Sequence, residues 1–327
     1  METQVKACIN INDDERMNSS SGGIYPLIAT KTIKNGGVVY AAVYDDNLDV
    51  IHKKLTTLEE IPESCGSKYI ASYLGDTFKN VLEDLENKRQ CLFVGTPCQC
   101  VGLINFLKKK EIDRLSLHKN LTIIDFVCHG VPTTNAWHSY LNAEKKRGFD
   151  VANVNMRDKS SGWSRLSYSV TLKDKNGDIK SIGWGANRFL AGFIANLYLR
   201  PSCYNCKFKG IERQTDITLG DFWGIWDLNP KMDDNKGTSL CLIHTPKGKN
   251  LLEELESESK IKSEIIESKD YIKYNESIVK TSTMHPKSEV FLKDMASGYD
   301  FIKLVDKYTG NTFRGKVKRK LKGLIRI

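Results

Sequence analysis

Apolar side chains in the first ninety residues alternate between helical spacing and short unbroken runs. Ile24, Leu27 and Ile28 fall on one face of a helix; serines before residue 22 and glycines at 36 and 37 bound this predicted helix of about four turns. Residues 38–43 form a continuous apolar run, which predicts a buried strand. The apolar spacing over residues 76–88 predicts an amphipathic helix.

The next segment predicts a strand–helix–strand unit. Residues 91–94 and 121–127 are short apolar runs, and the apolar spacing between them is helical. Two strands joined by a helix of this length are expected to be parallel. Cys98 follows the first strand and Cys128 follows the second, so both should lie at the carboxyl-end rim of the sheet, where open α/β sheets bind ligands.

The remainder of the pattern completes a mixed α/β prediction. Shorter strands are expected at 154–156, 166–172 and 179–182, two of them around Asn176-Gly177, a hairpin signal. A buried helix is expected at 187–199, strands at 216–222 and 239–244, and mainly helix after 246. The predicted fold is a parallel-sheet βαβ core with additional antiparallel strands, over residues 8–245, and a helical C-terminal extension, over 246–327.

Composition and charge narrow the class of protein. The chain has 327 residues, 40% of them hydrophobic, and no apolar run of the roughly 18 to 20 residues that a membrane span needs. The first six residues have no signal-peptide core, so a cytoplasmic protein with nine reduced cysteines is expected. The net charge is +9, but residues 303–327 carry nine Lys/Arg and one Asp, leaving about +1 for the rest. This distribution argues against a nucleic-acid partner, which favours a basic face on the folded body.

Four cysteines lie in Gly- or Pro-rich turns: Cys98, Cys128, Cys203 and Cys206, the last two at C-x-x-C spacing. Converging thiolates can hold an iron–sulfur cluster or zinc, and the spacing does not choose between them. The alternative is that they are small buried apolar residues, which we expect for the other five cysteines. A nucleophile–base pair of Cys98 and His129 is a further alternative.

Three other segments have two interpretations each. Ser21, Gly22 and Gly23 open a predicted helix, where backbone N–H groups attract a phosphate, although an ordinary serine-capped helix has the same pattern. The loop at 156–163 could grip a phosphate or a ring, or be a solvated turn. The basic amphipathic tail at 314–327 suits an anionic membrane surface or an acidic partner, or is a solvated terminus.

Seven motifs in the same order resemble the coenzyme F-420 hydrogenase/dehydrogenase beta-subunit family over roughly residues 8–245. They are SSGG at 20–23, GSKY at 66–69, GTPCQ at 95–99, CHG at 128–130, RDK at 157–159 with GW at 162–163, RPSCYNC at 200–206 and DITLGDFWG at 216–224.

The resemblance implies a flavoprotein oxidoreductase that binds FAD and one [4Fe-4S] cluster. It implies cluster ligation by Cys98, Cys128, Cys203 and Cys206, and flavin contacts from Ser21, Gly22, Gly23, Lys68, Thr96 and Arg157. No catalytic residue is assigned. Only Cys8 precedes the Ser-Gly-Gly loop, so we expect a separate ferredoxin-like electron carrier or partner subunit and a small-molecule hydride acceptor. A zinc-stabilised or degenerate accessory module, linked to polysaccharide biosynthesis, is the alternative function.

Overall fold

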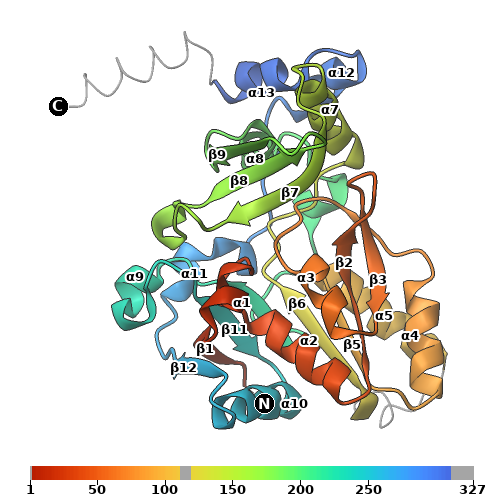
Figure 1. Ribbon diagram of the computed structural model, residues 1–327, viewed down its shortest axis with the longest axis vertical. Helices are drawn as coiled ribbons and strands as arrows, with labels where there is room; N and C mark the ends of the chain where they lie inside the picture. The colour runs from red at the N-terminus through yellow and green to blue at the C-terminus, as the bar shows by residue number, and fades with distance from the viewer. Residues whose placement is uncertain (1, 111–118, 311–327) are drawn as a thin grey trace.

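A large mixed sheet organises the chain in the computed structural model, which describes residues 2–110 and 119–310 (Figure 1). Within these residues the sheet has nine strands in the order β12-β1-β11-β10-β6-β5-β2-β3-β4. Their bounds are β1 (Gln4–Asn10), β2 (Val38–Tyr44), β3 (Val50–Leu55), β4 (Ser72–Tyr73), β5 (Cys91–Gly95), β6 (Leu121–Phe126), β10 (Ile217–Asp221), β11 (Ser239–Ile243) and β12 (Ile261–Ile265). The central strands β2, β5, β6 and β10 are parallel, whereas the strands beyond them are mostly antiparallel.

The predicted βαβ unit is present. Strands β5 and β6 pair in parallel, from Cys91 opposite Leu121 to Gly95 opposite Asp125, and α5 (Pro97–Lys109) connects them. Cys98 lies in the first turn of α5, not in a free turn, and Cys128 follows the end of β6. Both therefore reach the same rim of the sheet, as the sequence predicts.

Helices cover both faces of the large sheet because strand residues alternate in direction. In β2, Val39 and Ala41 pack under α2 (Ile24–Lys34), α3 (Ile61–Ser64) and α10 (Pro246–Ser257). Their neighbours Val38 and Tyr40 face α4 (Thr77–Glu86) and α5. Each fully buried Leu or Ile in these layers contributes roughly 1.5–3 kcal/mol of hydrophobic stabilisation.

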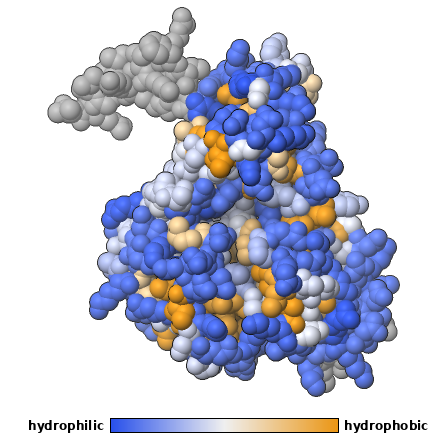
Figure 2. Space-filling view, viewed as in Figure 1, coloured by the Kyte–Doolittle hydropathy of each residue, from blue (hydrophilic) through white to orange (hydrophobic). Residues whose placement is uncertain are grey.

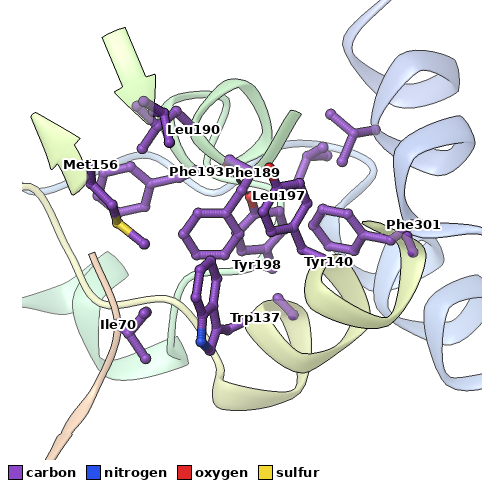
Figure 3. Packing of buried hydrophobic residues seen from close by; sticks show 14 of the residues in the cluster. Ile70, Trp137, Tyr140, Met156, Phe189, Leu190, Phe193, Leu197, Tyr198 and Phe301 are labelled. Carbon is purple, nitrogen blue, oxygen red and sulfur yellow. Dashed lines mark hydrogen bonds between the residues drawn. The ribbon is translucent and has the colours of Figure 1, made fainter. Parts of the chain in front are cut away.

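A second, antiparallel sheet lies beside the large one, at the top of Figure 1, and consists of β7 (Val151–Asp158), β8 (Ser169–Asp174) and β9 (Ile179–Gly183). It packs with α7 (Thr134–Lys145), α8 (Arg188–Ile194), α12 (Ser288–Ala296) and α13 (Phe301–Thr309). Figure 3 shows its aromatic core, in which Trp137 meets Phe189 edge-on with ring centroids 4.9 Å apart. This layer forms the second wall of the site described below.

The structure departs from the predicted elements in several places. Helix α2 has no side-chain cap, because its N-cap residue is Gly23, which has a left-handed conformation; the Ser21 hydroxyl donates to the Thr238 carbonyl. Helix α8 ends at Ile194, earlier than predicted. The segment after 246, expected to be mainly helical, contains the strand β12, and β1 was not predicted at all.

The remaining helices are short: α1 (Asp13–Met17), α9 (Ile225–Leu228) and α11 (Tyr271–Tyr274). None of the helices in the described ranges has the length and apolar character required to cross a membrane. The predicted basic amphipathic tail lies outside the described residues, and the division of the chain near residue 246 stays a prediction.

Candidate functional site

A cavity of about 1090 Å³ lies at the carboxyl-end rim of the parallel strands, and residues of the small sheet form part of its wall. Figure 2 shows a pale recess between the upper and lower parts of the molecule in this view. Lining residues come from the Ser-Gly-Gly loop, residues 64–72, the two cysteine loops after β5 and β6, and the aromatic segment at 219–226. This volume is at the upper end of the range for cofactor and ligand pockets.

The Ser-Gly-Gly loop reaches the cavity through a backbone path that requires glycine. A Cβ on Gly22 would lie 2.3 Å from the Cys8 carbonyl oxygen and 2.5 Å from the Ser239 nitrogen, and Gly23 has a φ of +78°. The Gly22 N–H donates to the Ser239 hydroxyl at 3.0 Å. Helix α2 then starts at the cavity wall with no side-chain cap, so its first N–H groups provide a favourable seat for an anion.

Lys159 fixes this loop from the small-sheet side. Its ammonium donates to the carbonyls of Ser21 at 2.7 Å, Arg16 at 2.5 Å and Lys236 at 2.7 Å. Burial, together with the charge of Arg16, lowers the Lys159 pKa to about 7. The loop at 156–163 is therefore not a solvated turn, since Lys159 is a buried brace for the Ser-Gly-Gly loop and Trp163 is fully buried.

Lys68 lies on the cavity wall in the segment 64–72. Its ammonium donates to the Cys65 carbonyl at 3.0 Å and lies 5.6 Å from the centre of the Tyr44 ring. Burial lowers the Lys68 pKa to about 8. The neighbouring Ser67 hydroxyl contacts Ser20 at 2.8 Å, so this segment and the Ser-Gly-Gly loop form one continuous wall.

Arg157, at the end of β7, connects the small sheet to the large one. Its guanidinium donates to Asp221 at 2.7 Å and to the Tyr69 hydroxyl at 3.2 Å, and stacks 3.9 Å above the Tyr168 ring. Burial alone would lower the Arg157 pKa, but the Asp221 charge raises it above its ordinary value. Its buried Nε has no hydrogen-bond partner among the described residues, although the side chain lines the cavity.

An aromatic wall supports Arg157. Trp163 and Trp223 stack with centroids 4.9 Å apart, and Tyr168 stacks on Trp223 at 6.2 Å. The Trp163 indole N–H donates to Asp221 at 3.1 Å, so the carboxylate that holds Arg157 is itself held. Such a wall presents flat apolar surface with one fixed positive charge, which suits a planar, electron-rich ring system.

The cysteines come from three segments: Cys98 and Cys128 line the cavity, whereas Cys203 and Cys206 are not among its lining residues. Cys98 is exposed on the lining, and its sulfur lies 3.1 Å from the Thr96 hydroxyl, the cap of α5. Cys128 also lines the cavity, in the loop after β6. The Cys203 sulfur accepts the Val131 N–H at 3.3 Å, which places the C-x-x-C loop, in a 3-10 turn over Pro201–Asn205, against the Cys128 loop.

The four thiols share one electrostatic environment. Burial raises the Cys128 pKa to about 12; Lys209 opposes this shift, and thiolate charge on Cys98, Cys203 or Cys206 adds to it. Burial likewise raises the Cys203 pKa, with contributions from Cys98 and Cys206. Within residues 2–110 and 119–310, no three His, Cys, Asp or Glu side chains are arranged to hold a single metal ion.

His129 is not positioned as a base for Cys98. Its Nε2 pairs with the Asn196 side-chain oxygen at 2.7 Å, whereas the Cys98 thiol contacts Thr96. Burial lowers the His129 pKa. The hypothesis of a Cys98–His129 nucleophile pair is therefore wrong for this structure.

Below the cysteine loops, a buried ion pair joins neighbouring strands. Asp125 of β6 accepts from Arg213 at 2.9 Å and also from the Thr218 hydroxyl of β10. His244, just after β11, contacts the same Thr218 hydroxyl at 2.8 Å. This network fixes the strand from which the Cys128 loop departs.

Sequence reasoning identified most of the cavity but not the groups that hold it in place. The residues predicted for the flavin contacts, except Gly22, whose backbone is buried beside them, line the cavity: Ser21, Gly23, Lys68, Thr96 and Arg157. Asp221, Tyr69 and Tyr168 were not assigned roles. The buried acid in the DFWG segment was the available signal for Asp221, since a buried Arg requires an acidic partner.

The fold and this site define a mixed α/β protein with a large rim cavity bordered by gathered thiols, and comparison with known proteins identifies the family. Residues 88–269, over half of the chain, match the family formed by the C-terminal region of the coenzyme F420 hydrogenase/dehydrogenase beta subunit. The chain belongs to this family, which confirms the predicted resemblance and assigns it to a class of redox subunits.

A solved structure has the same fold. It is a chain of the F420-reducing [NiFe] hydrogenase complex from Methanosarcina barkeri, studied by xenon derivatization. The TM-score is 0.55 at 14% sequence identity, over 93% of this chain and 90% of that chain, so the likeness concerns the fold alone. A search of curated proteins found no match.

Proposed function

We propose that this protein is an electron-transfer oxidoreductase that binds FAD in the rim cavity and a [4Fe-4S] cluster through Cys98, Cys128, Cys203 and Cys206. The observation that carries the proposal is that Cys98 and Cys128 line a cavity of about 1090 Å³ and that the C-x-x-C loop packs against the Cys128 loop. When bound, a flavin exchanges hydride with an organic substrate, and an iron–sulfur cluster exchanges single electrons.

The residues present fit a flavin dinucleotide. The uncapped N-terminus of α2 offers N–H groups to a pyrophosphate, supported by the nearby ammonium of Lys68. Arg157 lines the same space, and the Tyr168–Trp223 wall provides apolar surface.

The family to which the chain belongs favours a cluster over one zinc ion, because its members are redox subunits and zinc has no redox chemistry. Zinc brings its four ligands to a single atom, whereas a four-iron cluster receives each thiolate at a different iron and so accepts more widely spaced sulfurs. In this chain, charge on Cys98, Cys203 or Cys206 acts on Cys128, which is consistent with four ligands around one cofactor. Lys209, whose ammonium donates to the Cys128 carbonyl, supplies positive charge beside the deprotonated ligands.

The chain's own residues would position the reactants and exclude water. Thr96 and Gln99 fix the first turn of α5 and hence Cys98, and Lys159 fixes the Ser-Gly-Gly loop. The substrate of this site is proposed to be a small-molecule hydride acceptor, and electrons to come from a separate ferredoxin-like carrier or partner subunit.

Anaerobic purification with iron, sulfide, zinc and flavin quantified together tests the proposal. We expect about four iron and four sulfide per chain, with bound flavin and visible absorption. Cys203→Ser should lose iron, whereas Cys65→Ser, a half-buried thiol outside the ligand set, should keep it. Stoichiometric zinc without iron would instead establish the zinc-stabilised module.

A further inference from the structure

Exposed apolar side chains gather beside the cysteine loops. Of the thirteen exposed large hydrophobic residues in the described part of the chain, five occur in segments that touch these loops. We call them the cysteine-side patch: Phe126, Ile194, Phe208, Val279 and Met284. Phe126 and Ile194 also line the cavity, as does exposed Cys98. Such a concentration of exposed apolar surface is typical of a binding surface.

Hydrogen bonds hold the patch together although its residues are distant in sequence. The segment at 276–284 accepts the Lys209 ammonium at the Ser277 carbonyl, 2.7 Å away, and the Gly210 N–H at the Ile278 carbonyl, 2.8 Å away. On its other side, the Ser282 hydroxyl donates to the His129 carbonyl at 2.6 Å. The Asn196 amide reaches the Thr283 carbonyl at 2.9 Å. The patch is therefore fixed against the Cys128 loop and the C-x-x-C loop.

Positive charge is concentrated in the same segments. Residues 200–214 and 276–289 together contain six basic and three acidic residues, a net charge of +3, whereas residues 1–302 as a whole sum to about +1. Among the described residues, no carboxylate lies within ion-pair distance of exposed Arg200, Lys207 or Lys287. The apolar patch thus has an uncompensated basic rim.

We infer that the cysteine-side patch docks an acidic, one-electron carrier protein, with Arg200, Lys207 and Lys287 as the charged rim. This inference rests on the proposed function, because the carrier would deliver electrons to the cluster held by the adjacent thiols. Each encounter oxidises the carrier by one electron and reduces the cluster by one, and no bond forms or breaks. Two encounters supply the electron pair of one hydride, whose proton comes from solvent.

Charge argues against two other occupants of the patch. A second copy of this chain would present the same basic rim, so like charges would oppose a face-to-face dimer. The segment at 314–327 of the same chain is also strongly basic in sequence. An acidic partner alone complements the rim, and electrostatic attraction of this kind mainly raises the association rate.

The test compares charge reversal at the rim with the same change elsewhere. The probe is a small acidic ferredoxin, reduced and mixed with anaerobically purified protein. Lys207→Glu/Lys287→Glu should lower both the ferredoxin affinity and the rate of electron transfer by about tenfold or more at low salt, with a smaller difference at high salt. Phe208→Ser should lower the affinity at both salt concentrations. Lys262→Glu, an exposed site on β12, is the control and should have little effect.

A second electron donor separates this inference from the proposed function. Reduced methyl viologen, a small dye, should reduce wild type and variants equally, and iron content should not change. The docking surface would be overturned if the rim variant and Lys262→Glu lost ferredoxin affinity and electron-transfer rate equally, or if neither lost any. A wild-type dimer on gel filtration that Phe208→Ser converts to monomer would overturn it too, by assigning the patch to a second copy. Failure of the dye to reduce the wild type would overturn the proposed function and this surface with it.

Discussion

Gly22 shows how a single residue determines the shape of the cavity wall. An added Cβ would lie 2.3 Å from the Cys8 carbonyl oxygen, so Gly22→Ala must displace β1 or the loop. We expect a loss of about 1–3 kcal/mol in the free energy of unfolding, measured by urea titration followed by circular dichroism.

Gly185→Ala is the matched control for Gly22→Ala, because an added Cβ at Gly185 meets no atom within 4 Å and its φ is ordinary. The control should change the free energy of unfolding by no more than about 0.5 kcal/mol. An equal effect of the two substitutions would show that the close approach at Gly22 relaxes without cost.

Asp125 contributes to stability through its ion pair with Arg213. With side chains 1% and 5% exposed, Asp125 and Arg213 form a buried pair, so Asp125→Asn leaves a buried guanidinium without its countercharge. The expected cost is about 3–5 kcal/mol in urea unfolding. Asp76→Asn, which breaks an exposed pair with Lys79, should cost about 1 kcal/mol or less. A small effect at Asp125 would mean that water reaches Arg213.

At the scale of elements, His244 links three adjacent strands and should make their stability depend on pH. Burial, and next the charge of Arg213, lowers the His244 pKa to about 4, below its ordinary value near 6.5. The other groups of the network are Asp125, which pairs with Arg213, and Thr218, which contacts the imidazole. Because the unfolded chain binds a proton first, stability is full above about pH 6.5 and falls as the pH approaches 4.

Urea unfolding at pH 7 and pH 5 checks this dependence. From pH 7 to pH 5, the free energy of unfolding of His244→Gln should fall by about 2 kcal/mol less than that of wild type. The reason is that the variant lacks the histidine that binds a proton more tightly in the unfolded chain. His138→Gln, a half-exposed surface histidine on α7, is the control and should behave like wild type. If the stability of His244→Gln fell with pH as steeply as that of wild type, the dependence would belong to other groups, such as half-buried His52.

Local patterns predicted the elements that have strong periodicity and missed those defined by distant partners. The β5–α5–β6 unit follows from apolar runs of the expected length, and with it the common rim of Cys98 and Cys128. Strand β1 was missed because its pairing with β11 and β12 involves residues more than 230 positions away. The serine cap of α2 was predicted wrongly, because Gly23 is the N-cap residue and the Ser21 hydroxyl pairs with the distant Thr238 carbonyl.

At the scale of the whole molecule, one ion pair joins the two sheets across the cavity. Arg157 belongs to the small sheet, and Asp221 ends β10 of the large sheet; their side chains are 2% and 16% exposed. Removing either partner leaves a charge that is largely withdrawn from water. Arg157→Met and Asp221→Asn should therefore each cost about 3–5 kcal/mol, while the double variant should cost less than their sum.

A double-mutant cycle in urea, on protein freed of bound flavin, measures the coupling of Arg157 and Asp221 directly. We expect a coupling energy of about 1–3 kcal/mol, whereas the same cycle on the exposed Lys175–Asp150 pair should give less than about 0.5 kcal/mol. Flavin content of the untreated variants separates the two roles of Arg157. Asp221→Asn keeps the guanidinium but frees it from its anchor, so a loss of flavin in both single variants would mean that the cavity needs this residue held in place. If the unfolding free-energy changes of the two single variants added up to that of the double variant, and flavin content were normal, the sheets would be joined by apolar packing alone.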